Sequence, residues 1–220
     1  MVIDGRGSRW RRPAIVALAA IVVFLALLAT ATNLLPWGDG LDRGLHEWVL
    51  VHRQSVLVAI AAALTNLGSS WVTIPVVAVV AFAAAQADLR GRVIRSAVVV
   101  VVMAGGVLCR SAVAAIIARP RPPHPDWAVP ASGFSFPSGH STDAALAAGL
   151  LAWLLVRRVG ARGAIWAGAA GYATVVGATR VYLGVHWPSD VLGGWAFAVA
   201  WLAFASIALS ATGRPGTTSV

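Results

Sequence analysis

Three short stretches of the sequence concentrate histidine, arginine and aspartate beside long apolar runs. They are Arg119-Pro120-Arg121-Pro122, then Phe136-Pro137-Ser138-Gly139-His140, and then a stretch from Thr179-Arg180 through His186 to Asp190. Two histidines, a carboxylate and several guanidinium groups suit phosphoryl transfer. That reaction needs an in-line nucleophile, cations that hold the phosphate oxygens and an acid that protonates the leaving oxygen. The three stretches together form the candidate site.

The spacing within the stretches supports this interpretation. Asp190 follows His186 by four residues, so on a helix that begins near Trp187 the carboxylate can orient the imidazole. A histidine oriented by a carboxylate is a usual nucleophile or base. Ser138 and Gly139 precede a helix start whose free N–H groups attract an anion. Each stretch also has a plain structural interpretation: a proline-terminated helix exit, a capped helix start, or a surface His–Asp pair.

The composition indicates that lipid surrounds the elements that position these residues. Apolar residues form 59% of the chain and charged residues only 11%, with a mean hydropathy of +0.79; a soluble domain carries about 25% charged residues. Six stretches are long and apolar enough to span a bilayer as helices: residues 13–35, 70–87, 93–118, 140–156, 162–179 and 189–211. The sequence therefore predicts an all-α fold, a polytopic membrane helix bundle with about six transmembrane helices.

The remaining segments divide the chain into three regions. We expect a cytoplasmic basic N-terminus at 1–12, a membrane domain at 13–211 and a disordered tail at 212–220. Between the first two spans, apolar residues at helical spacing beside polar residues such as Asp42 and His46 predict a surface amphipathic helix with a solvated polar face. Residues 56–67 predict a partly inserted helix. A signal peptide cleaved near Ala29-Thr30-Ala31 is the alternative for the first span, but its apolar run is longer than a signal core.

The arginines predict the topology. All seventeen basic residues are arginine, and clusters within 6–12, 90–95 and 157–162 flank apolar runs as cytoplasmic loops do. No continuous basic face is available for nucleic acid. An N-terminus inside the cell places loops 119–139 and 180–188, and with them all three stretches, on the outer face. Arg119, Arg121 and Arg180 then violate the charge bias, so we expect chemistry to hold them there.

At this point the stretches resemble the motifs of the type-2 phosphatidate phosphatase (lipid phosphate phosphatase) superfamily. These motifs read Lys-x6-Arg-Pro, Pro-Ser-Gly-His and Ser-Arg-x5-His-x3-Asp. The second motif matches completely, and the third matches with Thr179 in place of serine. The first lacks its lysine, because alignment on Arg121 places Ala114 there. Arg110 lies one turn earlier, where it either replaces the lysine or forms a structural pair with Asp143.

The resemblance implies an integral membrane phosphatase with a phosphohistidine mechanism. His186 would be the nucleophile, Asp190 its orienting carboxylate, and His140 the acid and then the base. The phosphate-binding groups would be Arg121, Arg180, Ser138, the Gly139 N–H and Arg110.

The expected substrate is a membrane lipid phosphate or diphosphate. Isoprenyl diphosphate is the leading expectation, while phosphatidate, phosphatidylglycerol phosphate and a polyprenyl-linked sugar phosphate remain open. No cofactor or metal is expected, because the outer loops lack a carboxylate cluster, although His124 and Asp126 could supply ligands. The sequence does not indicate an oligomeric state. The alternative functions are a non-catalytic lipid-phosphate-binding protein and a lipid phosphotransferase.

Overall fold

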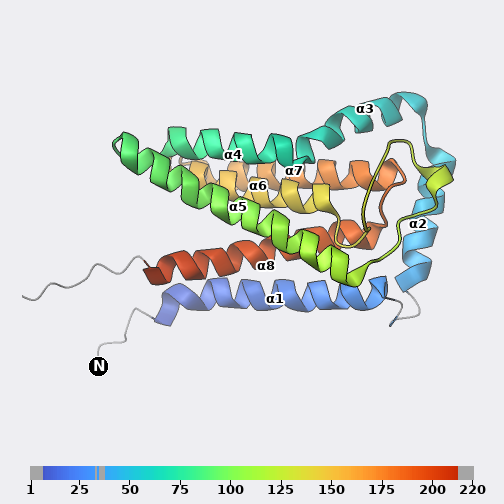
Figure 1. Ribbon diagram of the computed structural model, residues 1–220, viewed down its shortest axis with the longest axis horizontal. Helices are drawn as coiled ribbons and strands as arrows, with labels where there is room; N and C mark the ends of the chain where they lie inside the picture. Colours follow the sequence, from blue (N-terminus) through green and yellow to red (C-terminus); the bar gives the residue numbers. More distant parts are fainter. Residues whose placement is uncertain (1–6, 33, 35–37, 213–220) are drawn as a thin grey trace, which may run out of the picture.

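A computed structural model of the protein describes residues 7–32, 34 and 38–212, and this part of the chain contains helices and no strand (Figure 1). The α-helices are α1 (Gly7–Ala31), α2 (Gly38–His52), α3 (Ser55–Thr65), α4 (Ser70–Ala84), α5 (Leu89–Ile117), α6 (Gly139–Val156), α7 (Arg162–Tyr182) and α8 (Pro188–Thr212). Two short 3-10 helices are η1 (Asn66–Gly68) and η2 (His124–Asp126). The predicted all-α fold is confirmed. Most of the predicted tail lies outside the described residues.

Each of the six predicted membrane segments forms a helix. Among the described residues, four helices are long and apolar enough to cross a membrane: α1, α5, α6 and α8. A fifth span results if residues 55–68 and α4, which meet at a bend of 52°, form one broken span. The segment predicted to be partly inserted is the first half of that pair. α7 is long enough but less apolar, because it contains several glycines and Arg180. The predicted number of about six spans is reached only if the broken pair and α7 are each counted as a span.

The helices α1 and α4 to α8 run along the long axis of the molecule, and α2 crosses one end of them (Figure 1). Their shared core is a cluster of buried apolar residues contributed by α4, α5, α6 and α8: Val77, Ala81, Val99, Met103, Leu146, Ala147, Leu150 and Ala198. α1 packs beside α8, where the Phe24 ring lies 5.5 Å from Phe136 and 6.1 Å from Phe197 between centroids. α1 thus has a packing face within the bundle, although its retention after synthesis stays a prediction.

The connections between helices gather at the two ends of the bundle. One end, here called the arginine end, holds the beginning of α1, the turns at 85–88 and 157–161, and the end of α8. The other, here called the site end, holds α2, η1, the loop 118–138 and the turn 183–187. The arginine clusters predicted this same division of the loops. The structure therefore places all three chemically interesting stretches at one end.

The orientation of α2 corrects one prediction. α2 is amphipathic, as expected, but its polar residues Asp42 and His46 are buried, each 3% exposed. Its apolar residues Leu41, Leu45 and Trp48 are exposed instead. The expected solvated polar face is therefore wrong for Asp42 and His46. The reason is that both side chains have polar partners at the site end, which buries them as hydrogen-bonded groups and leaves the exposed apolar residues of α2 to face lipid.

Candidate active site

His186 and Asp190 form the centre of the site. His186 lies in the turn before α8 and Asp190 lies in the first turn of α8, and the two residues are 1% and 0% exposed. His186 Nδ1 lies 3.3 Å from Asp190 Oδ2. The main-chain N–H of Trp187 donates to the same oxygen over 2.8 Å. The pair predicted from the four-residue spacing is present, and it fixes the imidazole by its Nδ1 side.

The other ring nitrogen of His186 accepts a hydrogen bond from Arg121. Arg121 Nη1 lies 2.8 Å from His186 Nε2. A guanidinium only donates hydrogen bonds, so Nε2 carries a lone pair and Nδ1 carries the proton. Burial lowers the pKa of His186 to about 4, although the charge of Asp190 opposes this shift. The ring is therefore held as the neutral tautomer with its nucleophilic nitrogen facing a cation.

Arg121 is bound on all sides by acceptors from the protein. Its Nε and Nη2 groups donate to the carbonyls of residues 132–134 over 2.7–3.2 Å. Its Nη1 donates to the carbonyl of Val185 over 2.8 Å in addition to His186. Loop 118–138 thus folds back on its own arginine. A phosphate-binding role for Arg121 requires that a phosphate oxygen replace at least one of these acceptors.

A second arginine, Arg119, holds the other oxygen of Asp190. Its Nη1 lies 2.5 Å from Asp190 Oδ1, and its Nη2 lies 2.7 Å from Asp42 Oδ2. All three residues are buried. The Ser135 hydroxyl donates to Asp190 Oδ2, and the Ser189 N–H donates to Asp42 Oδ1 over 2.9 Å. Arg119 is therefore a buried cation between two carboxylates, an arrangement that is costly to break.

The sequence identified only part of this network. Arg119 drew notice because it violates the charge bias, but it was given no role. Asp42 and Ser135 were not identified as site residues. Only one feature of the sequence points to Asp42: it is an acid on a predicted membrane-surface helix, on the same side of the membrane as a loop with unexplained arginines. This feature does not indicate which arginine binds Asp42.

The second stretch is tied to the third through the main chain. The N–H of Ser138 donates to the carbonyl of Asp190 over 3.0 Å. The Ser138 hydroxyl accepts from Ser141 over 3.0 Å, and Ser138 is fully buried. Its predicted phosphate contact stays a prediction, because both groups have protein partners here. Ser138 precedes α6 without a side-chain capping bond, so the Gly139 N–H and its neighbours in the first turn are available to an anion.

Arg110 reaches the start of α6. A Cβ atom on Gly139 would lie 3.2 Å from Arg110 Nη2, so the missing side chain makes room for the guanidinium. Arg110 and Asp143 form no ion pair in the described part of the chain. Asp143 accepts from the Ser70 hydroxyl, while its Oδ1 and the Nε of Arg110 have no partner. Arg110 lies one turn below Ala114 and interacts electrostatically with Asp143, so its phosphate contact and its pairing with Asp143 both stay predictions.

His140 and Arg180 complete the site. His140 Nε2 lies 3.2 Å from the Ser69 hydroxyl, and Arg180 Nη1 donates to the Thr65 hydroxyl over 2.8 Å. His140 also interacts electrostatically with Arg121 of the first stretch and with Arg180 and His186 of the third. The structure thus gathers every predicted site residue at the site end: Arg110, Arg121, Ser138, Gly139, His140, Arg180, His186 and Asp190. Ser69 and Thr65, from the bent pair, were not anticipated.

The residues considered as metal ligands have other partners. Asp126 Oδ2 lies 2.9 Å from His46 Nε2, and the Asp126 carbonyl accepts from Arg53 over 2.8 Å. The His124 ring lies 4.8 Å from the Trp127 ring. Within the described ranges, no three His, Cys, Asp or Glu residues are grouped to hold a metal ion. Asp126 instead joins the loop 118–138 to α2.

Comparison with known sequences identifies relatives of this chain. The PAP2 superfamily matches residues 95–214, more than half of the chain. Phosphatidylglycerophosphatase B of Bacillus subtilis (strain 168) is 30% identical over 184 residues, which are 80% of this chain and 86% of that protein. Undecaprenyl-diphosphatase of Sulfolobus acidocaldarius is 35% identical over 80 residues, which are only 36% of this chain and 35% of that protein.

Comparison with solved structures gives the same result for the fold. The crystal structure of a transmembrane PAP2-type phosphatidylglycerolphosphate phosphatase from Bacillus subtilis superposes with a TM-score of 0.79 at 25% identity, covering 91% of this chain and 98% of that one. Aquifex aeolicus LpxE shares the fold with a TM-score of 0.60 at 23% identity, over 76% of this chain and 95% of its own. The chain therefore belongs to the PAP2 superfamily and is a multi-pass membrane protein with the PAP2 membrane fold.

Proposed function

We propose that this chain is a membrane phosphatase that hydrolyses a lipid phosphate or diphosphate at the outer membrane face through a phosphohistidine at His186. The observation that carries the proposal is the line Arg121–His186–Asp190, in which Nδ1 is held by a carboxylate and Nε2 has a lone pair facing a cation. The relatives support it, because those that match this chain in sequence are named as phosphatases.

The first step begins with an exchange of partners by Arg121. An oxygen of the incoming phosphate accepts the hydrogen bond of Arg121 Nη1, which releases the lone pair of His186 Nε2. Nε2 then forms a bond to phosphorus while the bond from phosphorus to the lipid oxygen breaks. His140, which enters this step in its protonated form, donates a proton to that departing oxygen. Asp190, held by Arg119, keeps the proton on Nδ1 and stabilises the positive charge of the ring.

The second step restores the enzyme. A water molecule attacks phosphorus, the new P–O bond forms and the N–P bond to His186 breaks. His140, which is neutral after the first step, accepts the proton of this water. Inorganic phosphate then leaves. Every proton in the two steps is accounted for by His140 and water.

Arg110, Arg180 and the N-terminus of α6 hold the phosphate oxygens in this scheme. The Nε atoms of Arg110 and Arg180 are buried without a partner in the described structure. Buried donors of this kind normally have an acceptor, and an anion in the site would supply one. Arg110 then takes the part of the family lysine that is absent at Ala114.

Two lipids are the first substrates to test. Isoprenyl diphosphate is the expectation from the sequence. Phosphatidylglycerophosphate is indicated by the name of the Bacillus relative that covers most of this chain. Phosphate release would be measured from each with detergent-purified protein in EDTA, comparing the unmodified protein with His186→Ala. His52→Ala, at an exposed histidine of α2 at the same end, is the matched control.

We expect release that survives EDTA, persists in His52→Ala and is lost in His186→Ala. With lipid labelled in its phosphate, quenching the unmodified protein in base during turnover should trap an acid-labile label on the protein that His186→Ala lacks. Loss of activity in EDTA would contradict the metal-free scheme. Binding without release by folded protein would indicate the lipid-binding function, and release only in the presence of an acceptor lipid would indicate a phosphotransferase.

A further inference from the structure

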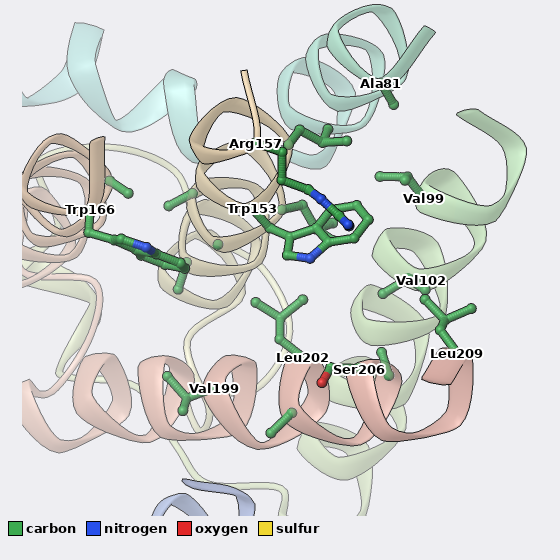
Figure 2. Close-up of a pocket in the computed structure, with 18 of the residues that line it drawn as sticks. Ala81, Val99, Val102, Trp153, Arg157, Trp166, Val199, Leu202, Ser206 and Leu209 are labelled. Carbon is green, nitrogen blue, oxygen red and sulfur yellow. The ribbon is translucent and has the colours of Figure 1, made fainter. Parts of the chain in front are cut away.

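A large cavity extends among the helices from the arginine end (Figure 2). Its volume is about 1320 Å³, and residues of α1, α4, α5, α6, α7 and α8 line it. The walls are mostly apolar, as Val99, Val102, Val199 and Leu202 show in Figure 2. Pockets for small molecules usually measure about 300–1,000 Å³. This cavity is large enough for a ligand with long apolar chains.

The cavity is separate from the catalytic machinery. α6 connects them: His140 lies in its first turn, and Trp153 and Arg157 lie at its far end beside the cavity. A helix rises 1.5 Å per residue, so Arg157 lies about 25 Å along α6 from His140, whereas Ala145, which also lines the cavity, lies about 7.5 Å from it. None of the predicted site residues lines the cavity. Its occupant is therefore not the substrate in its reacting position.

The rim of the cavity is strongly and uniformly basic. Four arginines line it: Arg12, Arg95, Arg157 and Arg158. A smaller cavity of about 560 Å³ adjoins it through the shared residues Trp153, Arg157 and Trp166, and Arg162 also lines this second space. No Asp or Glu is among the lining residues of either cavity. Apolar walls thus meet a basic mouth without a protein carboxylate to neutralise it.

Two tryptophans mark the boundary between the two spaces. Trp153 and Trp166 are about half exposed, at 46% and 50%, and their rings stand at the cavity wall in Figure 2. The Arg157 guanidinium lies 5.3 Å from the centroid of the Trp153 ring. Tryptophan is typical of the level where acyl chains give way to headgroups. The order along this path is apolar chamber, tryptophans, then arginines.

We propose that these joined cavities bind one anionic glycerophospholipid, with its acyl chains in the larger space and its phosphate among the arginines of the smaller one. The lipid belongs to the leaflet opposite the catalytic end. A zwitterionic lipid has the same chains but no net charge for the basic mouth to attract, so the site should select by charge. Each arginine near an anionic lipid favours binding by about fivefold. This inference does not depend on the proposed phosphatase activity.

The test uses quenching of tryptophan fluorescence by lipids with brominated acyl chains, which quench only on contact. The full chain is reconstituted in phosphatidylcholine vesicles that contain a small fraction of brominated phosphatidylglycerol or, in a parallel sample, brominated phosphatidylcholine. We expect stronger quenching by the phosphatidylglycerol. The excess should disappear in Trp153→Phe with Trp166→Phe, which shows that the contact is made at this cavity.

Charge variants give the decisive comparison. Arg157→Gln with Arg162→Gln should weaken the binding of phosphatidylglycerol by about fivefold for each arginine removed. Arg90→Gln with Arg92→Gln removes the same charge at the same end, but neither residue lines either of these two cavities. This control pair should leave the quenching nearly unchanged. Ala170→Phe, which places a ring in the larger cavity, should reduce quenching by both lipids.

Two results would overturn the proposal. Equal quenching by both brominated lipids would mean that the tryptophans meet only the general lipid around the protein. An equal effect of the two arginine pairs would mean that net charge attracts lipid without a defined site. Because the readout is fluorescence, loss of phosphatase activity cannot be mistaken for loss of lipid binding.

Discussion

The two ends of the bundle use arginine in opposite ways. At the site end, Arg119 and Arg180 are 7% and 4% exposed and each is hydrogen-bonded to a side chain. At the arginine end, Arg90 and Arg157 are exposed, and no arginine of that end forms an ion pair within the described ranges. All five histidines lie at the site end: His46, His52, His124, His140 and His186.

The difference lies in the acceptors that surround the arginines. At the site end, Asp42 and Asp190 fix the guanidinium group of Arg119, and the carbonyls of 132–134 fix that of Arg121. At the arginine end, Asp88 is the only acid among the described side chains, and it caps α5 by accepting from the Gly91 N–H over 3.0 Å. The same residue type therefore gives fixed geometry where carboxylates are present. Where they are absent, it gives an exposed charge available to lipid.

The largest expected effect separates the two carboxylates that share Arg119. Asp190→Asn should lower kcat by about 10⁴-fold, because an amide no longer fixes the tautomer of His186 or stabilises its positive charge. Asp42→Asn, on the far side of Arg119, touches no ring nitrogen of His186 and should lower kcat much less. Phosphate release under single-turnover conditions measures both. Equal losses would show that the network acts as one unit and that Asp190 has no separate part.

A stability measurement tests the contrast between buried and exposed arginines directly. Arg119→Met leaves two buried carboxylates without their cation and should reduce the free energy of unfolding by about 3–5 kcal/mol. Arg90→Met at the arginine end should change it by no more than about 0.5 kcal/mol. Thermal unfolding of the detergent-purified variants, at one scan rate, gives the comparison. Similar unfolding temperatures for the two variants would mean that the Arg119 network contributes little to the fold.

The sequence predicts the features of this molecule that are local. Hydropathy locates the helices, because each span depends only on its own residues, and a four-residue spacing is enough to pair His186 with Asp190. The Arg119–Asp42 bond joins residues 77 positions apart, and the acceptors of Arg121 are loop carbonyls without a side-chain pattern. The periodicity of the sequence therefore predicts neither the Arg119–Asp42 bond nor the acceptors of Arg121. α2 shows the same limit, because its pattern defines two faces but does not say which one meets the protein.

A smaller effect is expected for Arg110, which lies one turn before Ala114, the position where the family motif has lysine. Arg110→Ala should lower kcat/KM by about 10²–10³-fold, since it removes one cation from the transition state. Arg110→Ala combined with Ala114→Lys places the family lysine one turn higher and should recover part of this loss. Arg90→Ala, at an exposed arginine on the same helix that lines neither cavity, is the matched control for helix content. Failure of the lysine to restore activity, in folded protein, would favour a structural part for Arg110.

The smallest expected effect is the pH dependence of stability that arises from His186 at the site end. With its pKa near 4, His186 should stay neutral down to pH 5, whereas a histidine in the unfolded chain takes up a proton near pH 6.5. Stability should therefore fall as the pH drops from 6.5 toward 4, because the unfolded chain then binds a proton that folded His186 does not bind. NMR of ¹⁵N-histidine-labelled protein, with the signal assigned by its loss in His186→Asn, measures the titration. A midpoint at or above 6.5 would mean that the charge of Asp190 outweighs burial, and the resting nucleophile would then be protonated.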